Sequence, residues 1–122
     1  MAESRGIKEL IFNYLIKRLK KMDGQFGPEQ PANADIQSLI DNVHNEVVTQ
    51  IGHQTHMYNA IVFRVQNLLG GTNWVIKVQI GEGNHDYLHL MIHQTVGVPV
   101  PIPPELTGLQ QGHTAHDPLV PF

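Results

Sequence analysis

The sequence predicts an α+β fold: one central helix wrapped by a four- to five-stranded antiparallel sheet, preceded by an additional amphipathic helix at the N-terminus. Two observations predict it. Apolar residues recur with a helical period in residues 3–21 and again in residues 34–51. After Gly52 the period becomes two, and several such segments follow one another with short turns between them. Helices followed by successive hairpins favour one sheet packed against a helix.

The N-terminal segment predicts a basic amphipathic helix over residues 3–21, which we separate as an extension from the domain formed by residues 22–122. Its apolar positions have helical spacing: Ile7, Leu10, Ile11, Tyr14 and Leu15. Lysines and arginines gather in its last turns, where they suit the helix dipole. Three roles stay open: docking on the protein's own sheet or on a second copy, lying on a membrane surface, and binding a partner or acting as a presequence. Residues 22–31, rich in glycine and proline, predict a loop.

The central helix is predicted over residues 34–51. Asn33 is a suitable N-cap, and Gly52 is a natural C-terminal stop. One face is apolar, formed by Ile36, Leu39, Ile40, Val43, Val47 and Ile51. This face is the expected helical side of the core.

Three strands are predicted over residues 57–66, 72–80 and 85–95, with turns over 67–71 and 81–84. Their inward-facing residues are expected to be Trp74, Ile76, Val78, Ile80, Leu88, Leu90 and Ile92. The first strand is apolar on both faces, which favours cover on both and hence docking of the N-terminal helix.

The last part of the chain begins with a proline-rich stretch, residues 96–104, that predicts an extended path without a full hydrogen-bond ladder. Residues 106–115 are expected to return as an edge strand. A fourth strand would complete the sheet.

Composition excludes several functions. The chain has 122 residues, typical of one domain, and no cysteine, so it holds no disulfide and no thiolate zinc site. Absence of cysteine fits a reducing compartment, and we expect a cytoplasmic protein without a membrane-spanning segment. Residues 1–21 hold six basic and two acidic side chains, whereas the remaining chain holds two basic and nine acidic ones. An acidic body argues against nucleic-acid binding.

Catalytic and metal chemistry are also poorly supported. The only serines, Ser4 and Ser38, lie in no nucleophile motif, so we expect no enzyme activity. Eight histidines are present, and His85, His89 and His93 share one face of a predicted strand. Successive members of that series are about 13 Å apart along a strand, too far to share one ion. The pairs His53 with His56 and His113 with His116 lack further ligands, so we expect scattered surface histidines, no metal and no cofactor.

The order of several segments resembles the stefin branch of the cystatin family, the cysteine-free intracellular cystatins. The resemblance covers about residues 22–122 and is carried by four segments: residues 30–37 (QPANADIQ), 70–78 (GGTNWVIKV), His89-Leu90 and the C-terminal residues 117–122 (DPLVPF). It implies a cystatin-like fold and reversible tight-binding inhibition of papain-like cysteine proteases, cathepsins among them. Inhibition in this family is steric and uses a wedge of three segments.

By the same resemblance, the wedge residues are Gly24 in the N-terminal trunk, the first hairpin loop, and the second hairpin loop. The two loops are formed by Asn67, Leu68, Leu69, Gly70, Gly71, Val96, Gly97 and Val98. The family also implies a homodimer formed by strand exchange.

Three features depart from the family pattern. Asn67 stands where the family has glutamine, Val96-Gly97 replaces a Leu-Pro pair, and 21 residues precede Met22. The alternative function is therefore a non-inhibitory protein of the same fold that uses its basic N-terminal helix to bind a partner or a membrane surface.

Overall fold

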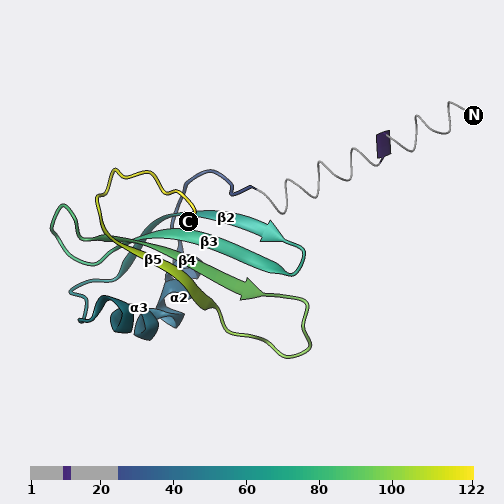
Figure 1. Ribbon diagram of the computed structural model, residues 1–122, viewed down its shortest axis with the longest axis horizontal. Helices are drawn as coiled ribbons and strands as arrows, with labels where there is room; N and C mark the ends of the chain where they lie inside the picture. The colour runs from purple at the N-terminus through teal and green to yellow at the C-terminus, as the bar shows by residue number, and fades with distance from the viewer. Residues whose placement is uncertain (1–9, 12–24) are drawn as a thin grey trace, which may run out of the picture.

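The computed structural model describes residues 10, 11 and 25–122, which form one antiparallel sheet with two helices on one face (Figure 1). The strand order is β1-β2-β3-β4-β5. The elements are β1 (Gln30–Pro31), α2 (Ala34–Asn42), α3 (His44–Ile51), β2 (Asn59–Leu68), β3 (Gly71–Gln79), β4 (Tyr87–Thr95) and β5 (Glu105–His113). The α+β prediction is confirmed. The helix expected over residues 3–21 lies, apart from Leu10 and Ile11, outside the described residues, as does Gly24.

The helical segment begins and ends as predicted but is interrupted. The side chain of Asn33 accepts a hydrogen bond from the Ile36 amide at 3.0 Å, and Gly52 closes the segment with a left-handed φ of 85°. The prediction of one helix is wrong, because the Val43 amide bonds to the Ile40 carbonyl, only three residues back, and separates α2 from α3. The tightened turn keeps Val43 buried, so the break costs no core contact.

The core lies between the helices and the sheet. The predicted inward faces of β3 and β4 are confirmed, since Ile76, Val78, Leu88, Leu90 and Ile92 are fully buried. They pack against Ile36, Leu39, Ile40, Val43 and Val47 from α2, α3 and the turn between them. A single continuous hydrophobic cluster therefore fixes the helices on the sheet.

Several strand boundaries differ from the prediction. Strand β2 starts two residues later than expected, at Asn59, and runs on through Leu68, with a register shift between Ala60 and Val62. The expected loop over residues 22–31 contains β1, whose Gln30 pairs with Phe63. Cross-strand pairing determines both where β2 begins and ends and that Gln30–Pro31 forms a strand, because the residues at these positions have no apolar period of their own. The predicted edge strand is confirmed as β5, although it ends at His113.

The opposite face of the sheet is covered by residues 114–122, which we call the C-terminal tail. Figure 1 shows the chain returning across the sheet from the end of β5 to the region of β2. Leu119 is 1% exposed. Arg64 donates to the Leu119 carbonyl at 2.9 Å, and Lys77 donates to the carbonyls of Ala115 and Asp117. In the described part of the chain, the tail supplies cover for the second face of β2, and the docking expected of the N-terminal helix lies outside the described residues.

Among residues 10, 11 and 25–122, no helix has the length and apolar character needed to cross a bilayer.

Candidate functional site

Two connecting segments project side by side from one end of the sheet. Strands β2 and β4 run in the same direction, so the β2–β3 hairpin and the 96–104 loop that follows β4 leave the sheet at the same end (Figure 1). The Val96 amide donates a hydrogen bond to the Gly70 carbonyl at 3.0 Å. The fold therefore brings together the two loop segments predicted from sequence.

The tip of the β2–β3 hairpin is shorter than predicted. Asn67 pairs with Thr72 and Leu68 pairs with Gly71, so only Leu69 and Gly70 form the turn. The predicted five-residue turn is wrong because cross-strand pairing continues to the last position that geometry allows. The Leu69 side chain is 71% exposed at the tip, whereas Leu68 is half-buried in the strand.

The two glycines of this hairpin have different surroundings. A Cβ on Gly71 would lie 2.5 Å from the Gln94 carbonyl oxygen and 2.8 Å from Cε1 of His93. A Cβ on Gly70 would have no neighbour within 4 Å, and Gly70 does not have a positive φ. Gly71 is therefore required by packing within the fold. Gly70 is not required by the turn, and its bare backbone allows close approach by another molecule.

The second loop is longer and more apolar than the three predicted residues. Val96, Gly97 and Val98 are exposed, and Gly97 has a left-handed φ of 79° that favours glycine. Val100 and Ile102 extend the exposed apolar surface. The signal for them was present in the sequence as aliphatic residues alternating with prolines in residues 98–104.

Together these residues form what we call the apolar edge: Leu69, Val96, Val98, Val100 and Ile102. They account for half of the large hydrophobic side chains that are exposed in the described part of the chain. No Asp, Glu, Lys or Arg occurs between Arg64 and Lys77 or between Asp86 and Glu105. A concentrated apolar surface without charges is typical of a binding surface rather than of a solvated loop.

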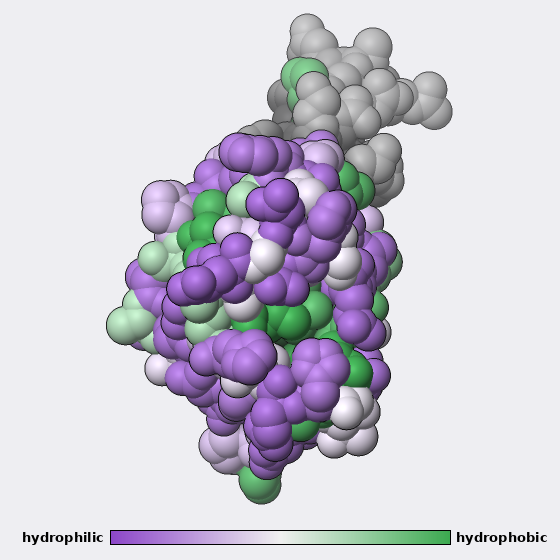
Figure 2. All heavy atoms as spheres, turned by 90° about the vertical axis from the view of Figure 1, so that its left-hand side faces the viewer, coloured by the Kyte–Doolittle hydropathy of each residue, from purple (hydrophilic) through white to green (hydrophobic). Residues whose placement is uncertain are grey.

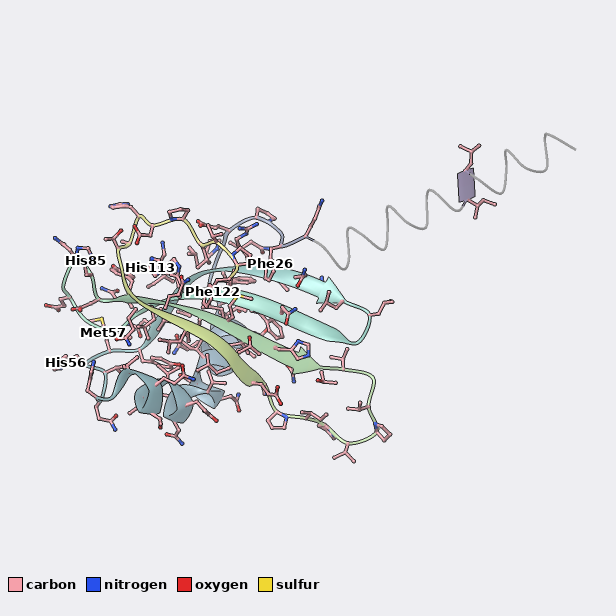
Figure 3. The ribbon with its side chains drawn as sticks, in the orientation of Figure 1. Phe26, His56, Met57, His85, His113 and Phe122 are labelled. Atoms are coloured by element: carbon pink, nitrogen blue, oxygen red, sulfur yellow. The ribbon has the colours of Figure 1, made fainter. Side chains whose placement is uncertain are left out.

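The chain that precedes β1 approaches the same end. The Gly27 amide bonds to the Val65 carbonyl at 2.8 Å, two residues further along β2 than the Gln30–Phe63 pair. Arg64 holds this segment by donating to the Gly27 carbonyl at 2.7 Å, and its guanidinium lies 6.0 Å from the centre of the Phe26 ring (Figure 3). Residues 25–27 therefore lie nearer the hairpin tip than β1 does, and the predicted site residue Gly24 lies just outside the described residues.

A polar row that sequence reasoning missed lies behind the apolar edge. Nδ1 of His93 donates to Oδ1 of Asn73 at 2.7 Å, and the Asn73 amide donates to Oε1 of Gln66 at 2.9 Å. The three residues occupy paired positions on β4, β3 and β2. We call them the polar row. Only strand register could have revealed it, because the three residues lie on three different strands.

The prediction of scattered surface histidines is wrong for His89. This residue is 1% exposed, its ring stacks on His113 with centroids 3.6 Å apart, and its Nε2 has no hydrogen-bond partner. Burial, with smaller contributions from the nearby His113 and Lys77, lowers the pKa of His89 to about 4. His85 lies in the turn before β4 and approaches the Gly112 carbonyl, so it does not share the strand face.

An acidic partner completes this cluster. Nδ1 of His113 lies 2.8 Å from Oδ2 of Asp117. The same carboxylate accepts from the amide and the hydroxyl of Thr114, and these bonds, the amide first, hold the pKa of Asp117 well below its usual range. No set of three or more His, Asp or Glu is arranged for a metal ion within residues 10, 11 and 25–122.

The histidine cluster lies away from the apolar edge. Figure 3 places His85 and His113 at the end of the sheet opposite the two loops. Figure 2 looks onto that end, whose surface is largely hydrophilic, with apolar surface near its middle and in smaller patches at its margins. The two loops thus carry apolar side chains and no Asp, Glu, Lys or Arg, whereas the opposite end of the sheet is largely polar.

Comparison with known proteins identifies the class. The chain is 30% identical over 101 residues to cystatin-B of Homo sapiens, which covers 83% of this chain and 99% of that protein. It is 30% identical over 102 residues to stefin-C of Bos taurus, covering 81% of this chain and 94% of that protein. Cystatin-B of Oplegnathus fasciatus is 27% identical over 109 residues. No family model matches the sequence.

Relatives at this identity and coverage, on an α+β fold of this topology, are cystatins. The chain belongs to the stefin branch of the cystatin family.

Proposed function

We propose that this protein is a reversible, tight-binding inhibitor of papain-like cysteine proteases, cathepsins among them, and that its apolar edge fills the active-site cleft. The observation that carries the proposal is the meeting, at one end of the sheet, of two loops without charged residues, joined by the bond from the Val96 amide to the Gly70 carbonyl. Inhibition of cysteine proteases is what family membership implies at the coarser level.

Blocking of this kind is steric and needs no reacting group on the inhibitor. Leu69 and Gly70 enter the centre of the cleft, where the glycine backbone can approach the protease closely. Val96, Gly97 and Val98 bind alongside, and Gly24 occupies the non-primed side. Because the hairpin is closed by the Leu68–Gly71 pair before binding, little ordering entropy is lost on association.

The test is a titration of papain and a panel of cathepsins with the full chain and two single variants. Leu69→Glu places a charge in the cleft, and we expect it to raise the inhibition constant at least about tenfold. Val120→Glu is the matched control, because Val120 is also an exposed aliphatic residue, 56% exposed, but lies in the tail. If Leu69→Glu inhibits as strongly as wild type, the hairpin is not part of the binding site. If wild type inhibits none of the proteases, the proposed function is wrong.

A second function is favoured by the N-terminal segment. Leu10 and Ile11 are exposed apolar residues in a stretch whose net charge is +4 over residues 1–21. We propose as the alternative that this segment binds an anionic membrane surface or a partner without protease inhibition. Co-sedimentation with phosphatidylserine vesicles, for wild type and for Leu10→Glu, separates the two. Binding that the variant loses supports the alternative, and no binding by wild type argues against the membrane.

A further inference from the structure

The polar row lies on the face of the sheet that the C-terminal tail covers, one step inside the apolar edge. The sheet donates hydrogen bonds to the tail from Arg64 and Lys77, which lie further along their strands from the loops than the polar row does. Between that covered area and the loop tips, the face is occupied by Gln66, Asn73 and His93, each half-buried. The polar row, and not the tail, is therefore the part of this face that lies nearest the two loops.

Each member belongs to a strand that carries part of the candidate site. Gln66 precedes the hairpin tip on β2, Asn73 follows it on β3, and His93 precedes the second loop on β4. Because the two hydrogen bonds, 2.7 and 2.9 Å long, run across the strands, they link the hairpin to the second loop through side chains.

The His93 ring also contacts the hairpin directly. It fills the space beside Gly71, where a Cβ would lie 2.8 Å from Cε1, and Nε2 has a longer 3.4 Å contact with the Thr95 hydroxyl. His93 is thus positioned by Asn73 on one side and by the backbone of Gly71 on the other. Movement of this ring would break its hydrogen bond to Asn73 and open the space beside Gly71.

We propose that Gln66, Asn73 and His93 are positioning residues, which hold the β2–β3 hairpin and the 96–104 loop in one arrangement before a protease binds. The inference rests on the proposed function. Loss of the row would lower the fraction of molecules whose loops are correctly placed, and the apparent dissociation constant rises in inverse proportion to that fraction.

The experiment compares full-length wild type with three variants. His93→Phe keeps a ring beside Gly71 but removes both nitrogens, and His93→Asn restores an amide donor near the position of Nδ1. His85→Phe is the matched control, because it removes a histidine bonded to the Gly112 carbonyl at the opposite end. The readouts are the dissociation constant for papain and amide hydrogen exchange, measured at Val96 and at the core amides of Ile76 and Leu90.

We expect His93→Phe to raise the dissociation constant about tenfold, if the competent fraction falls to about one tenth. Exchange at Val96 should accelerate by a similar factor while exchange at Ile76 and Leu90 stays unchanged, and His93→Asn should recover part of both. An equal effect of His85→Phe, or unchanged exchange at Val96 in His93→Phe, overturns the proposal. If wild type inhibits no protease, the proposed function fails, and exchange at Val96 alone decides whether the row positions the loops.

Discussion

At the scale of single residues, the hairpin glycines show that neighbours in sequence can be required for different reasons. Gly71 is enclosed by the Gln94 carbonyl and the His93 ring, whereas Gly70 faces open space. A bulky residue at Gly71 would therefore change the fold as well as the binding surface. Gly70 is the position at which binding can be tested without that complication.

We expect Gly71→Ala to lower the free energy of unfolding by about 1–3 kcal/mol, because the added methyl group meets backbone that cannot move freely. Gly70→Ala should change it by less than about 0.5 kcal/mol. Urea denaturation followed by circular dichroism measures both. Equal stabilities of the two variants would mean that β4 moves easily away from Gly71.

His89 supplies a pH dependence at the same scale. Its pKa of about 4 in the folded protein lies below the ordinary value of 6.5, so between these pH values the unfolded chain binds a proton that the folded protein does not. Stability should therefore fall as pH decreases from 6.5 toward 4, by about 2–3 kcal/mol at pH 4.5. The contribution of Asp117 has the same sign in a lower pH range: it is present above the ordinary carboxyl pKa and is lost as pH falls below that value.

Urea midpoints at pH 7 and pH 4.5, for wild type and His89→Phe, measure this contribution. The variant should lose most of the difference between the two pH values, because no proton binds at position 89 in either state. His85→Phe, which changes an exposed histidine, should keep the wild-type difference. If His89→Phe keeps the wild-type difference between the two urea midpoints, the pH dependence belongs to another group.

At the scale of elements, the C-terminal tail is a third layer rather than a disordered end. Leu119 is buried on the sheet, and its amide also donates to Oε1 of Glu29 at 3.1 Å. The tail therefore connects β2, β3 and the segment before β1. Arg64 donates both to the tail and to the Gly27 carbonyl, so the tail also helps to position residues 25–27, which lead from the N-terminal trunk into β1.

Leu119→Ala should lower the free energy of unfolding by about 2–5 kcal/mol, the usual range for a buried leucine. Val120→Ala is the adjacent control and should change it by less than about 0.5 kcal/mol, since that side chain is largely exposed. Thermal and urea denaturation of both variants give the comparison. Similar values for the two would show that the tail adds little to the fold.

At the scale of the whole molecule, the helices, sheet and tail form three layers, and the proposed site lies at one end of them. The apolar edge has no charged residue, while the stacked pair of His89 and His113 lies toward the other end of the sheet. This separation means that titration of the histidine cluster changes stability without placing charge in the proposed site.

Strand exchange between two copies stays a prediction at this scale. A dimer should appear when concentrated protein is partly unfolded and refolded, because an exchanged strand can take the place of its equivalent in a second copy and make the same pairings there. Size-exclusion chromatography with light scattering at two concentrations detects it. A monomer at every concentration, after refolding as well, would contradict the prediction.

The sequence by itself determined the fold class, the cap at Asn33, the stop at Gly52 and the inward faces of β3 and β4, because these depend on local propensity and on apolar period. It also indicated both loops of the candidate site. It did not determine where the hairpin closes, that Gln30–Pro31 pairs with β2, or that α2 and α3 are separate.

Tertiary structure alone decided the cover of the outer face and the surroundings of His89. It also decided the polar row, since Gln66, Asn73 and His93 meet only through strand register. The physical reason is the same in each case: a polar residue takes its role from the partner that burial and strand pairing bring to it, and that partner belongs to another element of the fold.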